Sequence, residues 1–195
     1  MPLVGVLALQ GDVREHEAML ASVGATSVAV RRPADLAGVD GVILPGGEST
    51  TISHLLTTSG LREPLGERIA DGLAVLGTCA GLILLSRAVR DGRADQWCYA
   101  ALDVEVRRNG YGRQISSFET TVTVTGVGDV PGVFIRAPRI ETWGPDVEVL
   151  ATHDHGDGVH PVLVRQERVW GCAFHPELTS DDRLHRLFVD TLEHG

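Results

Sequence analysis

Short apolar runs alternate with amphipathic segments as far as residue 90. The run LVGVLAL at residues 3–9 is apolar throughout, which is typical of a strand covered on both faces in a parallel sheet. Three further runs predict strands: 26–30, 41–44 and 73–76. Two segments with apolar residues three and four apart predict helices, 13–23 and 52–56, and the continuous apolar segment 82–85 after a glycine turn predicts another. This alternation predicts an α/β fold: a doubly wound, mostly parallel sheet with helices on both faces.

The pattern changes after a polar stretch at residues 90–96. Short strand-like segments dominate the rest of the chain: 102–106, 120–125, 133–135, 147–151, 161–165 and 169–173. A last helix places four apolar residues on one face: Leu184, Leu187, Phe188 and Leu192. The sequence has no Ser/Pro-rich linker, repeat or low-complexity segment. We therefore predict a single domain over residues 1–195, with an antiparallel portion of strands added to the parallel sheet.

The composition agrees with one acidic globular domain. Lys and Arg number 17 against 26 Asp and Glu, which gives a formal net charge of −9, and apolar residues make up 43 %. This acidic balance argues against nucleic acid or anionic lipid as a partner, because both bind basic surfaces. No apolar run approaches the roughly 20 residues that cross a bilayer, and the first residues lack the pattern of a secretion signal. We expect a cytoplasmic protein that does not bind membranes.

One of the three cysteines stands in a pattern that indicates a nucleophile. Cys79 lies in GTCAG, residues 77–81, between a predicted strand and a predicted helix. Flanking glycines permit the tight turn that lifts a nucleophile clear of a sheet, and a helix N-terminus stabilises a thiolate. A buried, inert cysteine beside packing glycines is the alternative. Cys98 and Cys172 lack this setting, and no C-x-x-C pair indicates a disulfide framework or a zinc site.

A cysteine nucleophile needs a base, and the base needs an orienting group. The segment FHPE, residues 174–177, follows the predicted strand 169–173. If Pro176 holds the segment extended, His175 and Glu177 point to the same side, and Glu177 can bond one ring nitrogen while the other faces Cys79. An isolated H-P-E is more often a solvated loop. Together with the tight glycine-flanked turn at Cys79, the H-P-E segment indicates a catalytic triad.

Acyl transfer through a thiol also needs N–H groups that stabilise the developing oxyanion. The backbone amide of Ala80 and one from Gly46 and Gly47 are the candidates, since glycine lets the backbone approach a substrate closely. The surrounding PGGEST segment matches no phosphate-binding motif, and Glu48 would repel a phosphate.

A histidine-rich segment at residues 153–160 raises the possibility of a metal site. His153, His155 and His160 alternate there with acidic residues and glycines. No regular element supports a ligand spacing, and the glycines mark a turn, so we predict a solvated hairpin loop and no metal site.

The motifs together resemble the class I, triad-type glutamine amidotransferases, and within them the glutaminase-subunit family of two-component pyridoxal 5′-phosphate synthases. The class is indicated by G-x-C-x-G with F-H-P-E. The narrower family is indicated by blocks in its order along the chain: L-x-L-Q-G at 7–11, R-E-H at 14–16, L-P-G-G-E-S-T-T at 44–51, R-N-x-Y-G-R-Q-x-x-S-F-E at 108–119, F-I-R-A-P at 134–138 and F-H-P-E-L-T at 174–179. Two departures are Ala100-Ala101-Leu102-Asp103 and Glu141-Thr142-Trp143.

The resemblance implies hydrolysis of L-glutamine to glutamate and ammonia, without a cofactor, and delivery of the ammonia to a separate pyridoxal 5′-phosphate synthase subunit. Cys79 would be the nucleophile, His175 the general base and then acid, and Glu177 the group that orients the imidazole. Six further residues match glutamine contacts of the family: Gly47, Glu48, Ser49, Arg108, Ile135 and Arg136. The chemistry agrees, since the α-carboxylate of glutamine pairs with a guanidinium and its α-ammonium with a carboxylate.

The resemblance also implies activation by the synthase partner. We expect the Gly46–Gly47 peptide to turn over and present either a carbonyl or an N–H to the oxyanion. Gln10 and Gly11, at the end of the first predicted strand, would sense the partner; the alternative is that Gln10 caps a turn. Two other functions stay open from the residues: a triad hydrolase or amidotransferase subunit of another pathway, and a cysteine redox or chaperone-like domain, which would not require His175 and Glu177.

Overall fold

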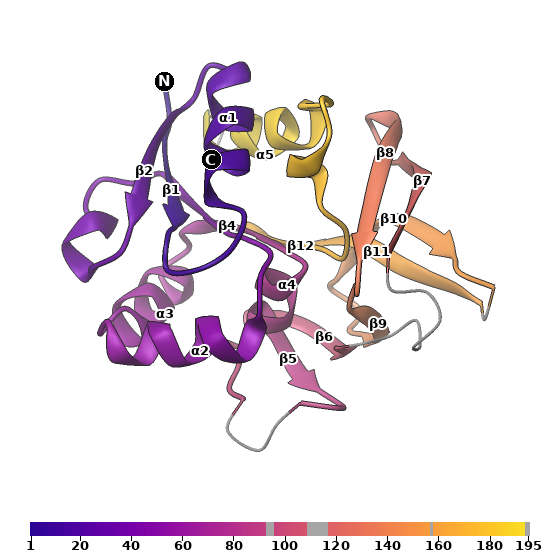
Figure 1. Ribbon diagram of the computed structural model, residues 1–195, viewed down its shortest axis with the longest axis horizontal. Helices are drawn as coiled ribbons and strands as arrows, with labels where there is room; N and C mark the ends of the chain where they lie inside the picture. Colours follow the sequence, from indigo (N-terminus) through magenta and orange to yellow (C-terminus); the bar gives the residue numbers. More distant parts are fainter. Residues whose placement is uncertain (93–95, 109–116, 157, 194–195) are drawn as a thin grey trace.

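The computed structural model describes residues 1–92, 96–108, 117–156 and 158–193, built around a seven-stranded sheet (Figure 1). The strand order is β10-β11-β12-β4-β3-β1-β2. Five neighbouring strands are parallel: β12 (Val169–Cys172), β4 (Ala74–Thr78), β3 (Gly41–Leu44), β1 (Leu3–Leu7) and β2 (Thr26–Val30). Two strands extend the sheet antiparallel: β11 (Val159–Gln166) and β10 (Glu148–Asp154). The predicted fold class is confirmed.

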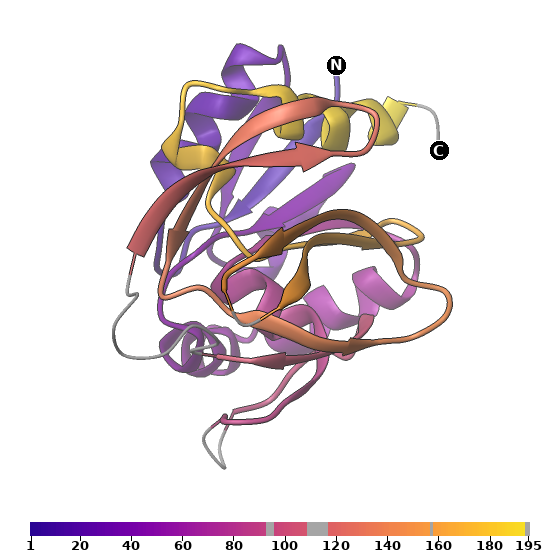
Figure 2. The same ribbon diagram turned by 90° about the vertical axis from the view of Figure 1, so that its right-hand side faces the viewer.

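Helices cover both faces of this sheet (Figures 1 and 2). One face carries α1 (Val13–Ser22) and α5 (Arg183–Glu193), and the other carries α2 (Ser49–Thr58), α3 (Arg62–Ala70) and α4 (Ala80–Leu85). Every residue of β3 and β4 is buried, which explains why their sequences are apolar without alternation. α5 packs directly on β3: a Cβ on Gly41 would lie 3.0 Å from Cδ2 of Leu192.

Two smaller sheets lie beside the main one. β5 (Ser86–Val89), β6 (Leu102–Arg107) and β9 (Arg139–Trp143) form the first, and the hairpin of β7 (Ser117–Val124) and β8 (Gly128–Ile135) forms the second. The backbone N–H of His175 donates to the carbonyl of Val133 in β8, at 2.8 Å. This bond ties the hairpin to the segment that follows β12.

The pattern of apolar residues did not predict α3, β5, β9 or the 3-10 turn η1 (Pro33–Leu36). α3 contains Pro64 and Gly66, and only Leu65 and Ile69 of it are buried. β9 alternates around one buried residue, Ile140, and is held by pairing with β6. Glu141 of β9, which belongs to one of the two departures from the family motifs, accepts hydrogen bonds from the guanidiniums of Arg107 and Arg139. The strands β5 and β9 form through pairing with β6 rather than through a strong local pattern.

No helix in the described part of the chain is long and apolar enough to span a membrane. The single-domain organisation and the cytoplasmic location expected from the sequence stay predictions.

Candidate active site

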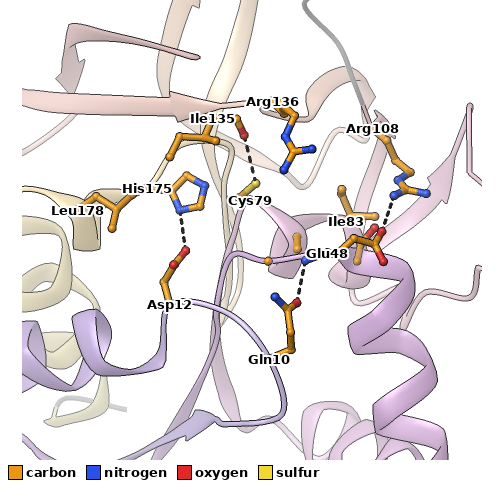
Figure 3. Close-up of a pocket in the computed structure, with 13 residues that line it drawn as sticks. Gln10, Asp12, Glu48, Cys79, Ile83, Arg108, Ile135, Arg136, His175 and Leu178 are labelled. Carbon is orange, nitrogen blue, oxygen red and sulfur yellow. Dashed lines mark hydrogen bonds and ion pairs between the residues drawn. The ribbon is translucent and has the colours of Figure 1, made fainter. Parts of the chain in front are cut away.

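Loops that follow neighbouring parallel strands meet at one edge of the main sheet. β12, β4, β3 and β1 are adjacent and run in the same direction, so their carboxyl ends lie together. These loops border a cavity of about 330 Å³ (Figure 3). Ten residues predicted from the sequence line it: Gln10, Gly47, Glu48, Ser49, Cys79, Ala80, Arg108, Ile135, Arg136 and His175. Three lining residues were not predicted: Asp12, Ile83 and Leu178.

Cys79 occupies a strained turn between β4 and α4. Its backbone φ is 48° and its ψ is −100°, a conformation that costs a residue with a side chain of order 1–3 kcal/mol. The flanking glycines make room for the turn: a Cβ on Gly77 would lie 2.6 Å from the carbonyl carbon of Gly81, and a Cβ on Gly81 would lie 2.0 Å from the oxygen of Leu44. The geometry matches a nucleophile elbow, and Sγ lies 3.9 Å from the carbonyl oxygen of Ile135.

His175 is held from one side by two carboxylates. Its Nδ1 lies 2.7 Å from Oε1 of Glu177 and 3.3 Å from Oδ2 of Asp12. Its other ring nitrogen points toward the sulfur of Cys79 (Figure 3). Burial by itself would lower the pKa of His175, but Asp12, Cys79 and Glu177 together raise it to about 12. The ring is therefore an imidazolium at neutral pH, with a proton to give to a leaving group.

Glu177 lies behind the cavity lining and is 3 % exposed. Burial raises its pKa, and the facing imidazolium of His175 opposes that shift, so the two form a buried ion pair. The prediction of an extended H-P-E segment is wrong, because Pro176–Leu178 form a 3-10 turn, η2. The fixed φ of proline suits the first position of such a turn. The turn, rather than strand alternation, brings the carboxylate to the ring.

Asp12 was missed as a contact of His175. It lies between β1 and α1, and its position at the same edge of the sheet was the available signal. Oxygens of Asp12 and Glu177 and a ring nitrogen of His175 lie within 4.8 Å of one another, the one such cluster among the described residues with the spacing of metal ligands. Nδ1 of His175 lies at hydrogen-bond distance, 2.7 Å, from Oε1 of Glu177, as expected where a proton lies between the two atoms. We therefore assign this cluster to holding a proton.

The histidine-rich segment is less solvated than predicted. His153 and His155 are half-buried and their ring centroids lie 4.5 Å apart. Both rings pack against Phe134, with centroids 5.8 and 5.2 Å away. Asp157, one of the acidic residues of this histidine-rich segment, lies outside the described residues. The prediction of a solvated loop is thus wrong for these two side chains, which form an aromatic cluster.

Opposite charges line the side of the cavity formed by α2 and the end of β6. Nη2 of Arg108 donates to Oε1 of Glu48 at 2.8 Å, and Nη1 donates to Oγ1 of Thr50 at 3.1 Å. Partial burial opposes ionisation of Glu48, but bonds from Thr51 and Thr50 and the charge of Arg108 lower its pKa to about 2. A fixed carboxylate beside a guanidinium suits the two charges of a free amino acid. The part of the R-N-x-Y motif at residues 109–116 lies outside the described residues.

The other predicted contacts surround this pair. Ser49 is buried and donates its hydroxyl to Oε1 of Gln96 at 3.3 Å. Arg136 has a φ of 43°, a second strained residue on the cavity, and follows Ile135 at the end of β8. Strain at two lining residues is typical of a functional site.

The Gly46–Gly47 segment is fastened to the loop after β1. The side chain of Gln10 accepts from the N–H of Glu48 at 2.8 Å, and the N–H of Asp12 donates to the carbonyl of Gly46 at 3.3 Å. A Cβ on Gly46 would lie 2.3 Å from Cε1 of His175, so only glycine fits against the ring. The loop after β1 therefore holds the peptide that was predicted to turn over.

Two further histidines lie behind Glu177, and both are fully buried: His16 of α1 and His185 of α5. Burial, His185 and His175 lower the pKa of His16 well below its ordinary value. Burial lowers the pKa of His185 to about 4, although Asp182 opposes the shift. Both rings are therefore neutral at pH 7. The sequence singled out His16 only as part of R-E-H, and His185 was not singled out.

Comparisons with known proteins agree with this site. The model of the SNO glutamine amidotransferase family matches residues 6–194. The pyridoxal 5′-phosphate synthase subunit PdxT of Mycobacteroides abscessus is 54 % identical over 195 residues, covering 100 % of this chain and 99 % of the relative. The protein of the same name from Frankia alni is 56 % identical over 191 residues, covering 97 % and 94 %.

Solved structures agree as well. One described as a glutamine amidotransferase superposes with a TM-score of 0.90 at 46 % identity, covering 97 % of this chain and 98 % of the other. The structure of PurLQS from Thermotoga maritima, at 16 % identity and a TM-score of 0.67 over 98 % and 99 % of the chains, shares the fold. The fold and these likenesses define a glutamine amidotransferase. The chain belongs to the SNO glutamine amidotransferase family, which confirms the resemblance stated from the motifs.

We expect acid to destabilise the fold through His185. Its pKa is lower in the folded state than in the unfolded one, so the native state binds fewer protons between about pH 6.5 and pH 4 and loses stability as the pH falls through that window. The free energy of unfolding, measured with urea, is compared at pH 7 and pH 4.5. The loss of stability between these two pH values should be smaller in His185→Gln than in the unchanged chain, by roughly 2–3 kcal/mol. The exposed His54→Gln is the control and should keep the original pH dependence. If the free energy of unfolding depends on pH equally in His185→Gln and in the unchanged chain, His185 is not the group through which acid destabilises the fold.

Proposed function

We propose that this chain is the glutaminase subunit of a two-component pyridoxal 5′-phosphate synthase. It hydrolyses L-glutamine to glutamate and ammonia through a thioester on Cys79 and passes the ammonia to a synthase subunit. The observation that carries the proposal is the arrangement of His175, which is held by Glu177 and faces a strained Cys79. The name of these relatives, pyridoxal 5′-phosphate synthase subunit, supports the choice of partner.

The first half of the reaction forms the thioester and releases ammonia. His175 first acts as base and holds the proton of the Cys79 thiol, so that the sulfur attacks the side-chain carbonyl carbon of glutamine as a thiolate, and the carbonyl π electrons move to the oxygen. The N–H of Ala80 and an N–H from the Gly46–Gly47 segment stabilise that oxyanion. The imidazolium of His175 gives its proton to the leaving nitrogen, the C–N bond breaks and ammonia departs.

The second half hydrolyses the thioester. His175, now neutral, takes a proton from a water molecule as its oxygen attacks the thioester carbon. The C–S bond breaks, and the sulfur and the imidazolium return to their starting state. The carboxylate of Glu177 stays ionised and keeps Nδ1 of His175 as a donor throughout, so the ring presents its other nitrogen to the reacting atoms.

Charge pairing orients the substrate. In the proposed complex the guanidinium of Arg108 binds the α-carboxylate and Glu48 binds the α-ammonium, replacing the 2.8 Å bond that the two side chains make with each other. Ser49, Gly47, Ile135 and Arg136 line the remaining space. A redox or chaperone-like role needs neither this ion pair nor the buried partner of His175.

Replacements in the triad should differ in effect. Cys79→Ala and His175→Ala should abolish glutamine hydrolysis, because each removes a group that forms or breaks a bond. Glu177→Gln should keep residual activity, because it disturbs only orientation and charge. Turnover is measured as glutamate release in the complex with the synthase subunit, and a glutamine-analogue electrophile should label Cys79 in mass spectrometry. Labelling of Cys98 or Cys172 instead, or near-full activity of His175→Ala, would refute the mechanism.

Arg108→Lys should raise the KM for glutamine. Lysine keeps the charge but loses the two-pronged donor geometry that matches a carboxylate, so binding weakens by about tenfold while kcat changes less. Arg87→Lys changes an exposed arginine of β5 and is a matched control that should leave both constants unchanged. An unchanged KM, together with equal hydrolysis of a glutamine that lacks its α-carboxylate, would show that Arg108 does not bind this group.

Activation by the partner should pass through the Gly46–Gly47 segment. We expect the isolated chain to be a poor glutaminase, and the synthase to raise kcat by about 10²–10³-fold, the usual worth of one oxyanion donor. Gln10→Ala removes the side chain that holds the N–H of Glu48 and should change that activation factor. Hydrolysis is measured with and without the synthase for both chains. Full activity of the isolated chain would show that the partner does not activate it. An unaltered activation factor in Gln10→Ala would show that Gln10 takes no part in the activation.

A further inference from the structure

The proposed reaction leaves a buried polar cluster behind the triad without a role. His16 is fully buried on α1, and its Nε2 lies 3.5 Å from Oε1 of Glu177 and 3.2 Å from Oγ1 of Thr78. Thr78 is the last residue of β4 and immediately precedes Cys79. The other nitrogen of the ring, Nδ1, lies 2.9 Å from Nε2 of His185 in α5. One ring therefore touches the carboxylate of the triad, the strand that carries the nucleophile, and the last helix.

The carboxylate of Glu177 has few other sources of stabilisation. Its Oε2 has no hydrogen-bond partner among the described residues, so Oε1 alone receives the bond from His175. A buried carboxylate with one unpaired oxygen is costly unless nearby N–H groups face it. The ring edge of His16 is such a neighbour, and the low dielectric of the core strengthens its effect.

The proton positions on the two rings follow from counting donors. Both rings are neutral, so each carries one N–H, and in the contact of 2.9 Å one ring donates and the other accepts. If His16 donated, its bare Nε2 would face the carboxylate, and the proton of His185 would sit on Nδ1, which has no hydrogen-bond partner in the part of the chain that the structure describes. If His185 donates, Nε2–H of His16 lies 3.2 Å from Oγ1 of Thr78 and 3.5 Å from Oε1 of Glu177, so both ring N–H groups have acceptors and the carboxylate faces an N–H rather than a lone pair. The second arrangement costs less.

We propose that His16 is a positioning residue of the glutaminase: its Nε2–H faces the Glu177 carboxylate and keeps it ionised and aimed at His175, and His185 selects the ring tautomer that makes this possible. The chain of groups runs from α5 through α1 and η2 to the cavity. His16 acts through Glu177 and touches neither substrate nor nucleophile. The kinetic part of this inference rests on the proposed function, whereas the tautomer does not.

The tautomer is tested first, in the unchanged chain. With ¹⁵N-labelled histidine, long-range ¹H–¹⁵N spectra distinguish a protonated ring nitrogen from a bare one. We expect the proton of His16 on Nε2 with Nδ1 bare, and the proton of His185 also on Nε2. A proton on Nδ1 of His16 would overturn the proposal, whatever the reaction turns out to be.

The kinetic test compares variants in the complex with the synthase subunit. His16→Leu removes the donor and should lower kcat by about tenfold or more at nearly constant KM, as loss of a group that acts only on the transition state requires. His16→Gln has an amide N–H in place of the ring donor and should recover most of that loss. Leu20→Ala removes a buried side chain one turn along α1 and is the packing control, expected to lose stability but not kcat. Equal kcat in His16→Leu and the unchanged chain, or no recovery in His16→Gln, would overturn the positioning role.

A double-variant cycle separates action through Glu177 from an independent effect. In the Glu177→Gln background, His16→Leu should lower kcat by less than about twofold, because the carboxylate that it serves is gone. A full, additive loss would overturn the proposal. If His16→Leu does not fold, the same cycle is run with His185→Leu, which frees the tautomer of His16 and should lower kcat by a few fold only where Glu177 is present. Failure of all glutamine hydrolysis in the unchanged complex, with the expected tautomers observed, would count against the proposed function alone.

Discussion

The contact between Nδ1 of His175 and the buried carboxylate of Glu177 is the interaction on which the rest of the site depends. An unpaired carboxylate in a core costs several kcal/mol, so this charge requires a cation held at short range. The cation is a histidine whose ring also rests on Gly46 and faces Cys79. The ion pair with Glu177 therefore fixes the plane of the His175 ring. That plane in turn sets the positions required of the Cys79 sulfur, the Gly46–Gly47 segment and the Val133 carbonyl.

The sheet meets this requirement by bringing separate segments together at one edge. Parallel strands place their following loops on the same side, and the strand order puts β12 next to β4 and β4 next to β3. Residues as far apart in the chain as Gln10 and His175 thus border one cavity. The hairpin of β7 and β8 adds a wall through the bond from His175 to Val133.

The sequence alone could predict the parts of this arrangement that have strong local signals. The apolar strands, the glycine-flanked Cys79 and the H-P-E segment were of this kind, and the structure brings them together. Local signals could not predict Asp12 as a partner of His175, because an aspartate after a strand is also a common helix start. Nor could they predict η2, where a proline allowed both an extended and a turned conformation, or β9, which exists only because β6 is there to pair with it. Buried His16 and His185 were equally hidden, since a histidine on an amphipathic helix carries no sign of which face it takes.

The backbone of Cys79 has a consequence for how such a protein changes over time. A residue with a side chain at a φ of 48° and a ψ of −100° stores strain that glycine would release, so the substitution that relaxes this turn most is also one that removes the sulfur. Stability and reactivity thus oppose each other at a single position. Selection for a robust fold alone would drive the elbow toward inactivity, and a lineage that lost its need for ammonia would be expected to lose this cysteine early, with its sheet intact.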